Sequence, residues 1–345
     1  MKRKFLFGAI ITALTLGACS TDDTADITII NEGGNNNEGG TFLSGNYIED
    51  LTLSADETYV LNGALVMNSG TTLTIPAGTT ISAQTGNNIY VAIAQGAKII
   101  AEGSENEPIV FTSNKTNPSA GDWGGLIILG RAPINSVSGN ATSTSEIGNL
   151  PYGGNISDDN SGTLSYVRIE YSGGSADGQT ENNGISFYGV GNGTTVNHIQ
   201  AFEGKDDGIE FFGGTVNASN IIVVNSQDDS VDWTEGYSGS LTDVYIKHGI
   251  DHDKGIEADG YNTDIGNNSS PVFWSSPTVT NLTIKGNGNN GDGTEAVRLR
   301  AGTRGQFTNV VIEGFDEGFD IDDNETGIGV ISDDLQVSDV TFTNV

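Results

Sequence analysis

The feature that most constrains this chain is a pair of short patterns that alternate along its second half. The first reads apolar, any, polar, apolar, any, apolar, and it recurs at 163–171, 194–202, 215–224, 240–248, 277–285, 305–313 and 335–343. The second has an apolar residue just after a polar pair, and it recurs at Ile185, Ile209, Val231, Ile256, Val297 and Phe319. The shortest separations are 22–25 residues, and longer ones indicate insertions. A shared period of this length predicts one structural unit repeated along an axis.

Each unit contains short β-branched runs between Gly, Asn and Asp turns, and no helical period is sustained. We therefore predict an all-β fold, a right-handed parallel β-helix solenoid with coils of about 22–25 residues and insertions. A β-sandwich shows no such self-similarity, and leucine-rich repeats would add a helical stretch. A membrane barrel needs longer strands, of about 9–11 residues. Residues 47–345 are expected to form a single β-helix domain.

The N-terminus has the pattern of a bacterial export signal. Three basic residues precede the apolar run 5–16, which is too short to span a bilayer. Residues 1–18 are therefore predicted to be a lipoprotein signal peptide, because the segment up to Cys19 resembles the bacterial lipobox. That resemblance implies lipidation of Cys19, the only cysteine. Residues 19–46 are expected to be a flexible, acidic and Gly/Asn-rich tether. The acidic residues after Cys19 resemble the export signal of Bacteroidota surface lipoproteins, which implies a lipid-anchored location on the outer membrane, exposed at the cell surface.

The charge balance restricts the partners. The chain has 45 Asp and Glu against 14 Lys and Arg, and its formal charge is −31. Such a charge is repelled by the phosphates of nucleic acids and by anionic membrane surfaces. We therefore expect no nucleic-acid partner, and contact with the membrane only through the lipid anchor. The charge is compatible with metal cations, cationic partners and neutral glycans.

Many of these acids fall in the second pattern, where successive coils would stack them at about 4.8 Å. The residues concerned are Asp206, Asp207, Glu210, Asp228, Asp229 and Asp232. We expect them to form an exposed ladder along one edge. Two such charges repel by about 3–4 kcal/mol at an effective dielectric of 20. A set of ligands made only of oxygen suits Ca²⁺, so these six residues are the predicted calcium site. The alternative is that the side chains point into water and that Asp caps the turns through the backbone.

Segments 73–81, 96–113 and 121–130, together with the acidic units, resemble secreted right-handed β-helix proteins of the pectin-lyase-like superfamily. More closely, they resemble functionally uncharacterised surface lipoproteins of Bacteroidota with that fold. The resemblance implies a ladder of stacked Asn at one strand corner. The recurrent polar slot of the first pattern fits this role, because Asn tolerates left-handed backbone and its amide can bond to the coils above and below.

The same superfamily contains polysaccharide lyases and glycoside hydrolases. For a calcium-dependent lyase, the resemblance implies an Arg as the base, and Arg298 is the candidate. The alternative is that Arg298 pairs with the carboxylates of its row. The galacturonidase motifs do not match, because Asn262-Thr263-Asp264 follows the Asp pairs and no Gly-His-Gly occurs. His248 and His252 lie in a Gly-rich turn, so we expect surface histidines rather than zinc ligands.

The function predicted from the sequence is that of a binding or adhesion module for a polysaccharide or another envelope component, with structural Ca²⁺. The first alternative is a calcium-dependent polysaccharide lyase or related carbohydrate-active enzyme. The second is a structural stalk without a ligand. No distinct cap is visible in the repeat pattern up to Val345. We therefore expect the C-terminal coil to be covered by a partner, by self-association or by an insertion such as 131–162.

Overall fold

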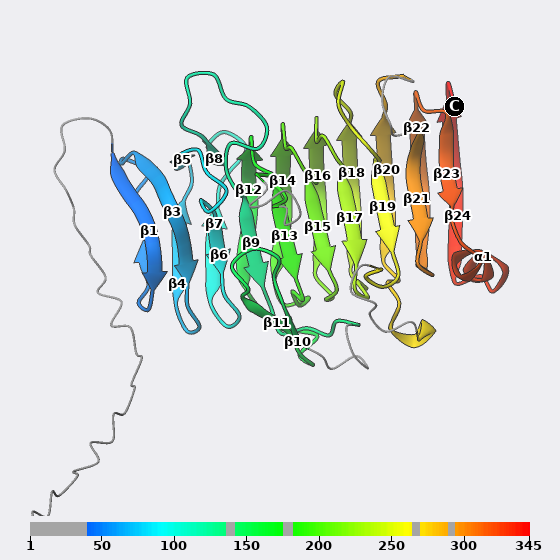
Figure 1. Cartoon of the computed structure of the whole chain (residues 1–345), viewed down its shortest axis with the longest axis horizontal. Helices are drawn as coiled ribbons and strands as arrows, with labels where there is room; N and C mark the ends of the chain where they lie inside the picture. Colours follow the sequence, from blue (N-terminus) through cyan, green and yellow to red (C-terminus); the bar gives the residue numbers. More distant parts are fainter. Residues whose placement is uncertain (1–39, 136–141, 175–181, 264–269, 289–293) are drawn as a thin grey trace, which may run out of the picture.

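The computed structural model describes residues 40–135, 142–174, 182–263, 270–288 and 294–345. Its strands pair in parallel from one coil to the next, and the coils follow one another along the long axis (Figure 1). The exception is one antiparallel hairpin, formed by β10 (Thr142–Thr144) and β11 (Pro151–Gly153). The predicted right-handed parallel β-helix is confirmed.

From residue 162 onward, each coil has one short and one long strand, and the row of short strands already begins in the N-terminal coils. The short strands are β6 (Val91–Ile93), β9 (Leu126–Leu129), β13 (Ile185–Tyr188), β15 (Ile209–Phe212), β17 (Val231–Thr234), β19 (Ile256–Asp259), β21 (Glu295–Arg300) and β23 (Glu317–Ile321). The long strands are β12 (Gly162–Glu170), β14 (Thr195–Phe202), β16 (Asn217–Val224), β18 (Ser240–Lys247), β20 (Thr278–Lys285), β22 (Gly305–Glu313) and β24 (Leu335–Thr343).

In the N-terminal coils the path of the long strand is divided between separate strands. These coils contain β1 (Thr41–Tyr47), β2 (Leu51–Thr52), β3 (Tyr59–Met67), β4 (Thr72–Pro76), β5 (Thr80–Ala83), β7 (Lys98–Glu102) and β8 (Ile109–Ser113). Strand β12 joins the two arrangements, because its first half pairs with β7 and its second half with β8. Strand β1 begins inside the segment predicted as tether, and its Leu43 is buried opposite Leu61. The expected start of structure at residue 47 is therefore too late.

The register of the strands follows both sequence patterns. Ile185 pairs with Ile209, which pairs with Val231, and the row continues to Phe319. The apolar residues of the first pattern form a second continuous row from Val167 to Val340. Because equivalent residues occupy neighbouring coils, each row is a column of apolar side chains inside the solenoid.

The predicted polar slot lies at the bend of the long strands. Its Asn and Asp residues have φ between 54° and 58°. Asn309 Nδ2 donates to Asn281 Oδ1 at 2.8 Å, and Asn281 Nδ2 donates to Asp243 Oδ1 at 2.7 Å. The ladder that the resemblance implied is therefore present over these three coils. The bend needs left-handed backbone, which Asn and Asp adopt more readily than most residues.

Aromatic rings fill the middle of the core. Phe187 stacks on Phe211 with ring centroids 5.1 Å apart, and Phe211 stacks on Tyr237 at 4.5 Å. Trp233 is fully buried, and its Nε1 donates to Thr303 Oγ1 at 3.2 Å. These rings form an aromatic ladder inside the solenoid.

The described parts of the insertion 131–162 cover the outer face of the short strands. Ile134, Ile147 and Tyr152 form a second buried cluster with outward-facing Tyr188 and Phe212. The rings of Tyr188 and Phe212 stack with their centroids 4.0 Å apart. The insertion therefore lies over the middle of the solenoid, where Figure 1 shows β10 and β11, and not over the last coil. The expectation that this insertion caps the C-terminal end is wrong, because its apolar side chains match those on β9, β13 and β15.

Two short helices lie in the C-terminal half of the described chain. They are the 3-10 helix η1 (Pro271–Phe273) and α1 (Asn324–Ile331), which precedes β24. Asp323 caps α1 by accepting a hydrogen bond from the Thr326 backbone N–H. Arg304 connects the two regions, because its guanidinium lies 4.7 Å from the Trp274 ring centroid and donates to the Glu325 carbonyl at 3.0 Å.

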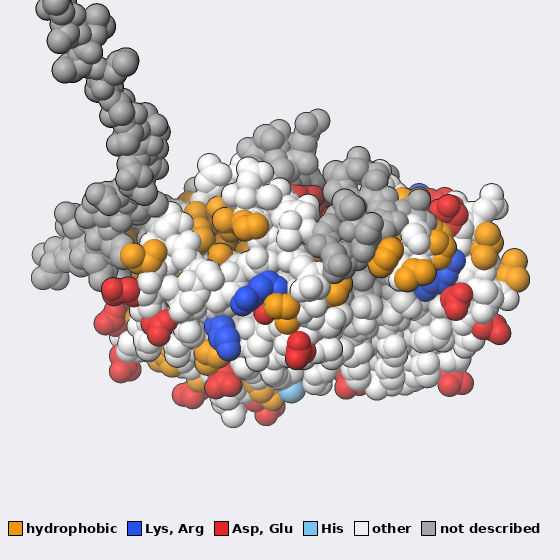
Figure 2. Space-filling model, turned by 90° about the horizontal axis from the view of Figure 1, so that it is seen from below, with side chains coloured by type: hydrophobic (Ala, Val, Ile, Leu, Met, Phe, Trp, Pro, Cys, Tyr) orange, Lys and Arg blue, Asp and Glu red, His pale blue; other side chains and the backbone are white. Residues whose placement is uncertain are grey.

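The acidic composition is visible on the surface. On the face shown in Figure 2, Asp and Glu side chains are spread along the length of the solenoid, whereas Lys and Arg form a few small groups. On this face, the described residues offer no continuous basic track of the kind that a polyanion binds.

Candidate functional site

The predicted calcium ligands come from two neighbouring coils. One Asp pair lies in the turn before β15 and the other in the turn before β17, and Glu210 pairs in register with Asp232 on these strands. Gly208 follows the first pair, and a Cβ there would lie 2.6 Å from the Ser230 carbonyl oxygen. The Asp-Asp-Gly sequence therefore allows the two turns to stack closely, which brings their carboxylates together.

These carboxylates form four overlapping triads. Within each triad, one carboxylate oxygen per residue lies within 4.8 Å of the others. The triads are Asp206–Asp207–Asp228, Asp207–Glu210–Asp232, Asp228–Asp229–Asp253 and Asp229–Asp232–Glu257. All six predicted residues are included, and Asp253 and Glu257 extend the cluster by one coil. We refer to these eight residues as the carboxylate cluster.

The carboxylate cluster is more buried than predicted. Asp206, Asp207 and Asp229 are buried, and Glu210 and Asp232 are partly buried. The expectation of an exposed ladder is therefore wrong. The turns pack tightly on each other, and the insertion covers the neighbouring outer-face residues Tyr188 and Phe212. Sequence periodicity identified the outward direction of these side chains, but it carries no information about an insertion that folds back over them.

Some carboxylates of the cluster also cap the turns by accepting backbone hydrogen bonds, as expected in the alternative to a calcium site. Asp207 Oδ1 accepts a hydrogen bond from the Asp229 N–H at 3.0 Å, and Asp229 Oδ1 accepts one from the Lys254 N–H at 2.6 Å. Glu210 Oε2 accepts one from Asn183 Nδ2 at 2.6 Å. Asp232 Oδ1 is buried and has no hydrogen-bond partner in the described part of the chain. Capping therefore satisfies only some of the carboxylate oxygens.

Burial and mutual repulsion act together on these groups. Desolvation, followed by the charges of neighbouring carboxylates, raises the pKa of Asp207 and Asp232 well above its usual range. The pKa values of Glu210 and Asp229 are raised for the same two reasons. At neutral pH the site therefore favours protonated carboxyls or a bound cation over bare charges.

In the described part of the chain, basic side chains form ion pairs at one end of the cluster. Lys254 is buried and pairs with Asp253 and, at 3.6 Å, with Glu295. Arg300 pairs with Glu257, and its Nε lies 2.6 Å from Asp259 Oδ1. Within the described residues, no Lys or Arg forms an ion pair with the other end, which consists of Asp207, Glu210, Asp229 and Asp232. This end is the part of the cluster that suits an added cation.

The comparison with protein families agrees with this fold. A family model described as a pectate-lyase-like beta helix domain matches residues 45–345. The chain belongs to this family. No curated protein and no solved structure matches it.

Although the chain belongs to the pectate-lyase-like family, the surroundings of Arg298 do not suit a catalytic base. Arg298 lies 2.6 Å from Asp322 and 3.7 Å from Glu257. Burial lowers its pKa, but the hydrogen bond and charge of Asp322 outweigh burial and raise it. A guanidinium held in its charged form is a poor proton acceptor, so the arrangement agrees with the charge-pairing alternative.

Two of the three histidines, His248 and His252, are placed differently from the prediction. His248 and His252 are buried rather than exposed, with ring centroids 4.3 Å apart, and His248 packs against Phe315. The turn after β18 folds inward here, which the Gly-rich sequence did not indicate. Burial, followed by the neighbouring His252, lowers the pKa of His248 to about 3. No group of three metal-ligating side chains in the described residues includes either histidine.

One further feature was missed at the sequence level. A cavity of about 470 Å³ lies on the long strands β12, β14, β16 and β18. Its lining includes Tyr166 and His198, which occupy the bend slot where later coils have Asn or Asp. The presence of Tyr and His in place of Asn or Asp at this slot was the sequence signal that could have indicated the cavity. It was overlooked because both residues fit the loosely polar position of the first pattern.

Cys19 and the predicted signal peptide lie outside the described residues. No helix in the described part of the chain is long and apolar enough to cross a membrane.

The raised carboxyl pKa values predict a specific pH dependence in a chelator. The stability they contribute is fully present below their unfolded pKa of about 4 and is lost as pH rises through the higher folded values. In EDTA, Asp232→Asn should therefore become increasingly stabilising, relative to wild type, between pH 4.5 and 8. Urea denaturation midpoints measure this difference.

Asp316→Asn is the control, because it removes one exposed carboxylate in the turn before β23, outside the carboxylate cluster. His248 acts in the opposite direction. Its depressed pKa removes stability as pH falls from 6.5 towards about 3. This contribution cancels when variant and wild type are compared at the same pH. A midpoint difference for Asp232→Asn that does not change with pH would contradict the prediction.

Proposed function

We propose that this pectate-lyase-like β-helix is a lipid-anchored binding module of the bacterial surface. It binds a glycan or another envelope component, and Ca²⁺ stabilises its carboxylate cluster. The observation that carries the calcium part is the triad Asp207–Glu210–Asp232, which contains a buried carboxylate oxygen without a hydrogen-bond partner among the described residues.

The chemistry of the donors supports Ca²⁺ over other metals. The cluster offers only carboxylate oxygens, and the described residues add no His or Cys to any triad. Hard oxygen ligands in this number suit Ca²⁺, which accepts irregular geometry and six to eight ligands. A bound Ca²⁺ would neutralise the end of the cluster with which no Lys or Arg of the described residues forms an ion pair.

Binding is favoured over catalysis by what surrounds the short strands. The insertion packs against Tyr188 and Phe212, so part of the outer face beside the carboxylates is covered. Arg298, the residue proposed as a base, is engaged by two carboxylates. The long strands instead present an extended face with repeated side chains, which suits an elongated polymer.

The calcium proposal predicts that the stability difference between wild type and a variant without two of the carboxylates has opposite signs in Ca²⁺ and in EDTA. Ca²⁺ at about 100 times its Kd should stabilise the wild-type protein by about 2.7 kcal/mol. The double variant Asp207→Asn/Asp232→Asn should be more stable than wild type in EDTA, because repulsion is relieved, and should gain little from Ca²⁺. Urea midpoints with and without Ca²⁺ measure both effects.

Asp316→Asn should respond to Ca²⁺ as wild type does, since it changes an exposed carboxylate of the same type outside the cluster. A wild-type midpoint that is the same in EDTA and in millimolar Ca²⁺ would remove calcium from the proposed function.

The anchor is supported by the sequence alone, through the lipobox-like segment that ends at Cys19. Metabolic labelling with radioactive palmitate should mark the protein in a bacterial host that processes lipoproteins. Cys19→Ala should abolish the label. Label that persists in this variant would rule out Cys19 as the lipidation site.

The choice between binding and lyase activity has a direct test. On native gels containing a soluble polysaccharide, the protein should be retarded by at least one polymer. It should release no product that absorbs in the ultraviolet when incubated with uronic-acid polymers and Ca²⁺. Release of such a product, and its loss in Arg298→Ala, would support the lyase alternative instead.

A further inference from the structure

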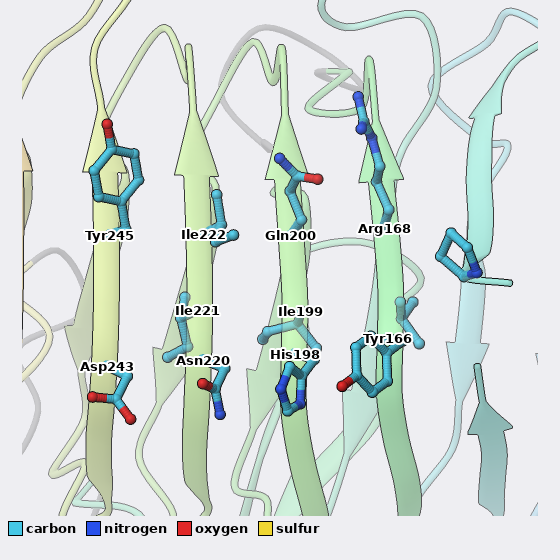
Figure 3. A pocket seen from close by; sticks show the side chains of 12 residues that line it. Tyr166, Arg168, His198, Ile199, Gln200, Asn220, Ile221, Ile222, Asp243 and Tyr245 are labelled. Carbon is cyan, nitrogen blue, oxygen red and sulfur yellow. The ribbon is translucent and has the colours of Figure 1, made fainter. Parts of the chain in front are cut away.

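The cavity on the long strands is distinct from the carboxylate cluster. It forms a groove across β12, β14, β16 and β18 (Figure 3). The cluster lies on the short strands and the turns before them. Its volume of about 470 Å³ is within the range of ligand pockets. Two rows of side chains border it. One follows the bend of the strands, and the other lies closer to their C-terminal ends.

The bend row contains an unexpected pair of residues. Tyr166 and His198 have φ of 53° and 51°, a left-handed conformation that is costly for Tyr, although His adopts it more readily than most residues. The next residues in this row are Asn220 and Asp243, which tolerate it better. The same bend is thus made without aromatic residues in later coils, so the fold does not require them here. Backbone strain that the fold does not require, as at Tyr166, is common at functional sites.

Stacking explains how the pair is accommodated but not why it is present. The rings of Tyr166 and His198 are nearly parallel, with centroids 4.2 Å apart. This contact offsets part of the backbone strain. His198 nevertheless remains exposed at the groove, where it presents an imidazole edge beside the Asn220 amide. The bend row therefore offers polar groups of the kind that bind hydroxyls.

The second row contributes apolar surface. Ile222 and Tyr245 are neighbours in register on β16 and β18, and they are 40% and 36% exposed. Two adjacent exposed hydrophobic residues within one groove form a platform for the C–H face of a ligand. Gln200 lies next to Ile222 in the same row and adds an amide. A platform bordered by amides, an imidazole and a carboxylate matches the mixed polar and apolar faces of a sugar ring.

The electrostatics of the groove favour an uncharged ligand. Arg168 pairs with Glu170 and lies 4.6 Å from the Phe202 ring centroid, so its charge is already compensated. Asp243 adds an exposed carboxylate, and the whole chain has a formal charge of −31. A uronic-acid polymer would be repelled here.

We propose that this groove binds a neutral saccharide chain, which runs across the strands from β12 to β18. The inference rests on the proposed binding function and assigns its site and its ligand class. Sugar rings pack on Ile222 and Tyr245, while the bend row hydrogen-bonds their hydroxyls.

The test uses affinity gel electrophoresis of the full chain with defined polymers. The neutral probes are a β-glucan, a galactomannan and an α-mannan, and the acidic probes are polygalacturonate and alginate. Wild type should be retarded by at least one neutral probe and by neither acidic probe. Tyr245→Ala should weaken that binding at least tenfold.

His198→Asn separates a binding role from a structural one. Asn suits the left-handed bend, so this variant should keep or raise the urea midpoint while binding the retained probe several-fold more weakly. Thr283→Ala is the matched control, because Thr283 pairs with Tyr245 in the next coil and lies outside the groove. It should bind as wild type does.

The possible failures are distinguishable. Unchanged binding by Tyr245→Ala and His198→Asn would overturn the groove and leave the binding module standing. Retardation by the acidic probes alone would overturn the neutral ligand class and the groove with it. Retardation by none of the five probes would overturn this inference together with the proposed glycan-binding function.

Discussion

Parallel pairing of successive coils is the interaction on which the rest of the structure depends. It places equivalent residues of neighbouring coils about 4.8 Å apart, so every side chain has a similar neighbour above and below. For apolar and aromatic residues this contact is favourable, as in the stack of Phe187 on Phe211. For charged residues it is unfavourable, and the cost grows when the row is partly buried. The carboxylate cluster results from that constraint.

The protein deals with the same repulsion in two ways along one edge. Towards the C-terminal end, Lys254, Arg298 and Arg300 supply opposite charges to the row. Asp232 lies one coil earlier and Asp207 two coils earlier. Among the described residues, neither forms an ion pair with Lys or Arg, and the pKa values of both are raised. In the proposed function, Ca²⁺ takes the place of the missing basic side chains. A single cation can contact carboxylates from two coils, so it would also tie those coils together.

Much of the fold was predictable because the constraint is periodic. The rows through Ile209 and Ile221 were read from spacing alone, and their register is as expected. Six of the eight members of the carboxylate cluster were also identified from spacing, since stacking follows directly from the repeat. Errors occurred where the chain departs from the repeat. The insertion covers part of the outer face, and the turn after β18 buries His248 and His252.

By itself, the sequence determined the solenoid, the inward rows and the residues that share an edge, because a period of 22–25 residues permits few other packings. Only the tertiary structure decided how buried that edge is, which carboxylates have a basic partner and where a groove opens. Those properties depend on contacts between segments far apart in the chain, such as Tyr152 with Glu235 or Arg300 with Asp259. A repeat pattern specifies neighbours in adjacent coils, but it does not specify what an insertion or a turn brings to them.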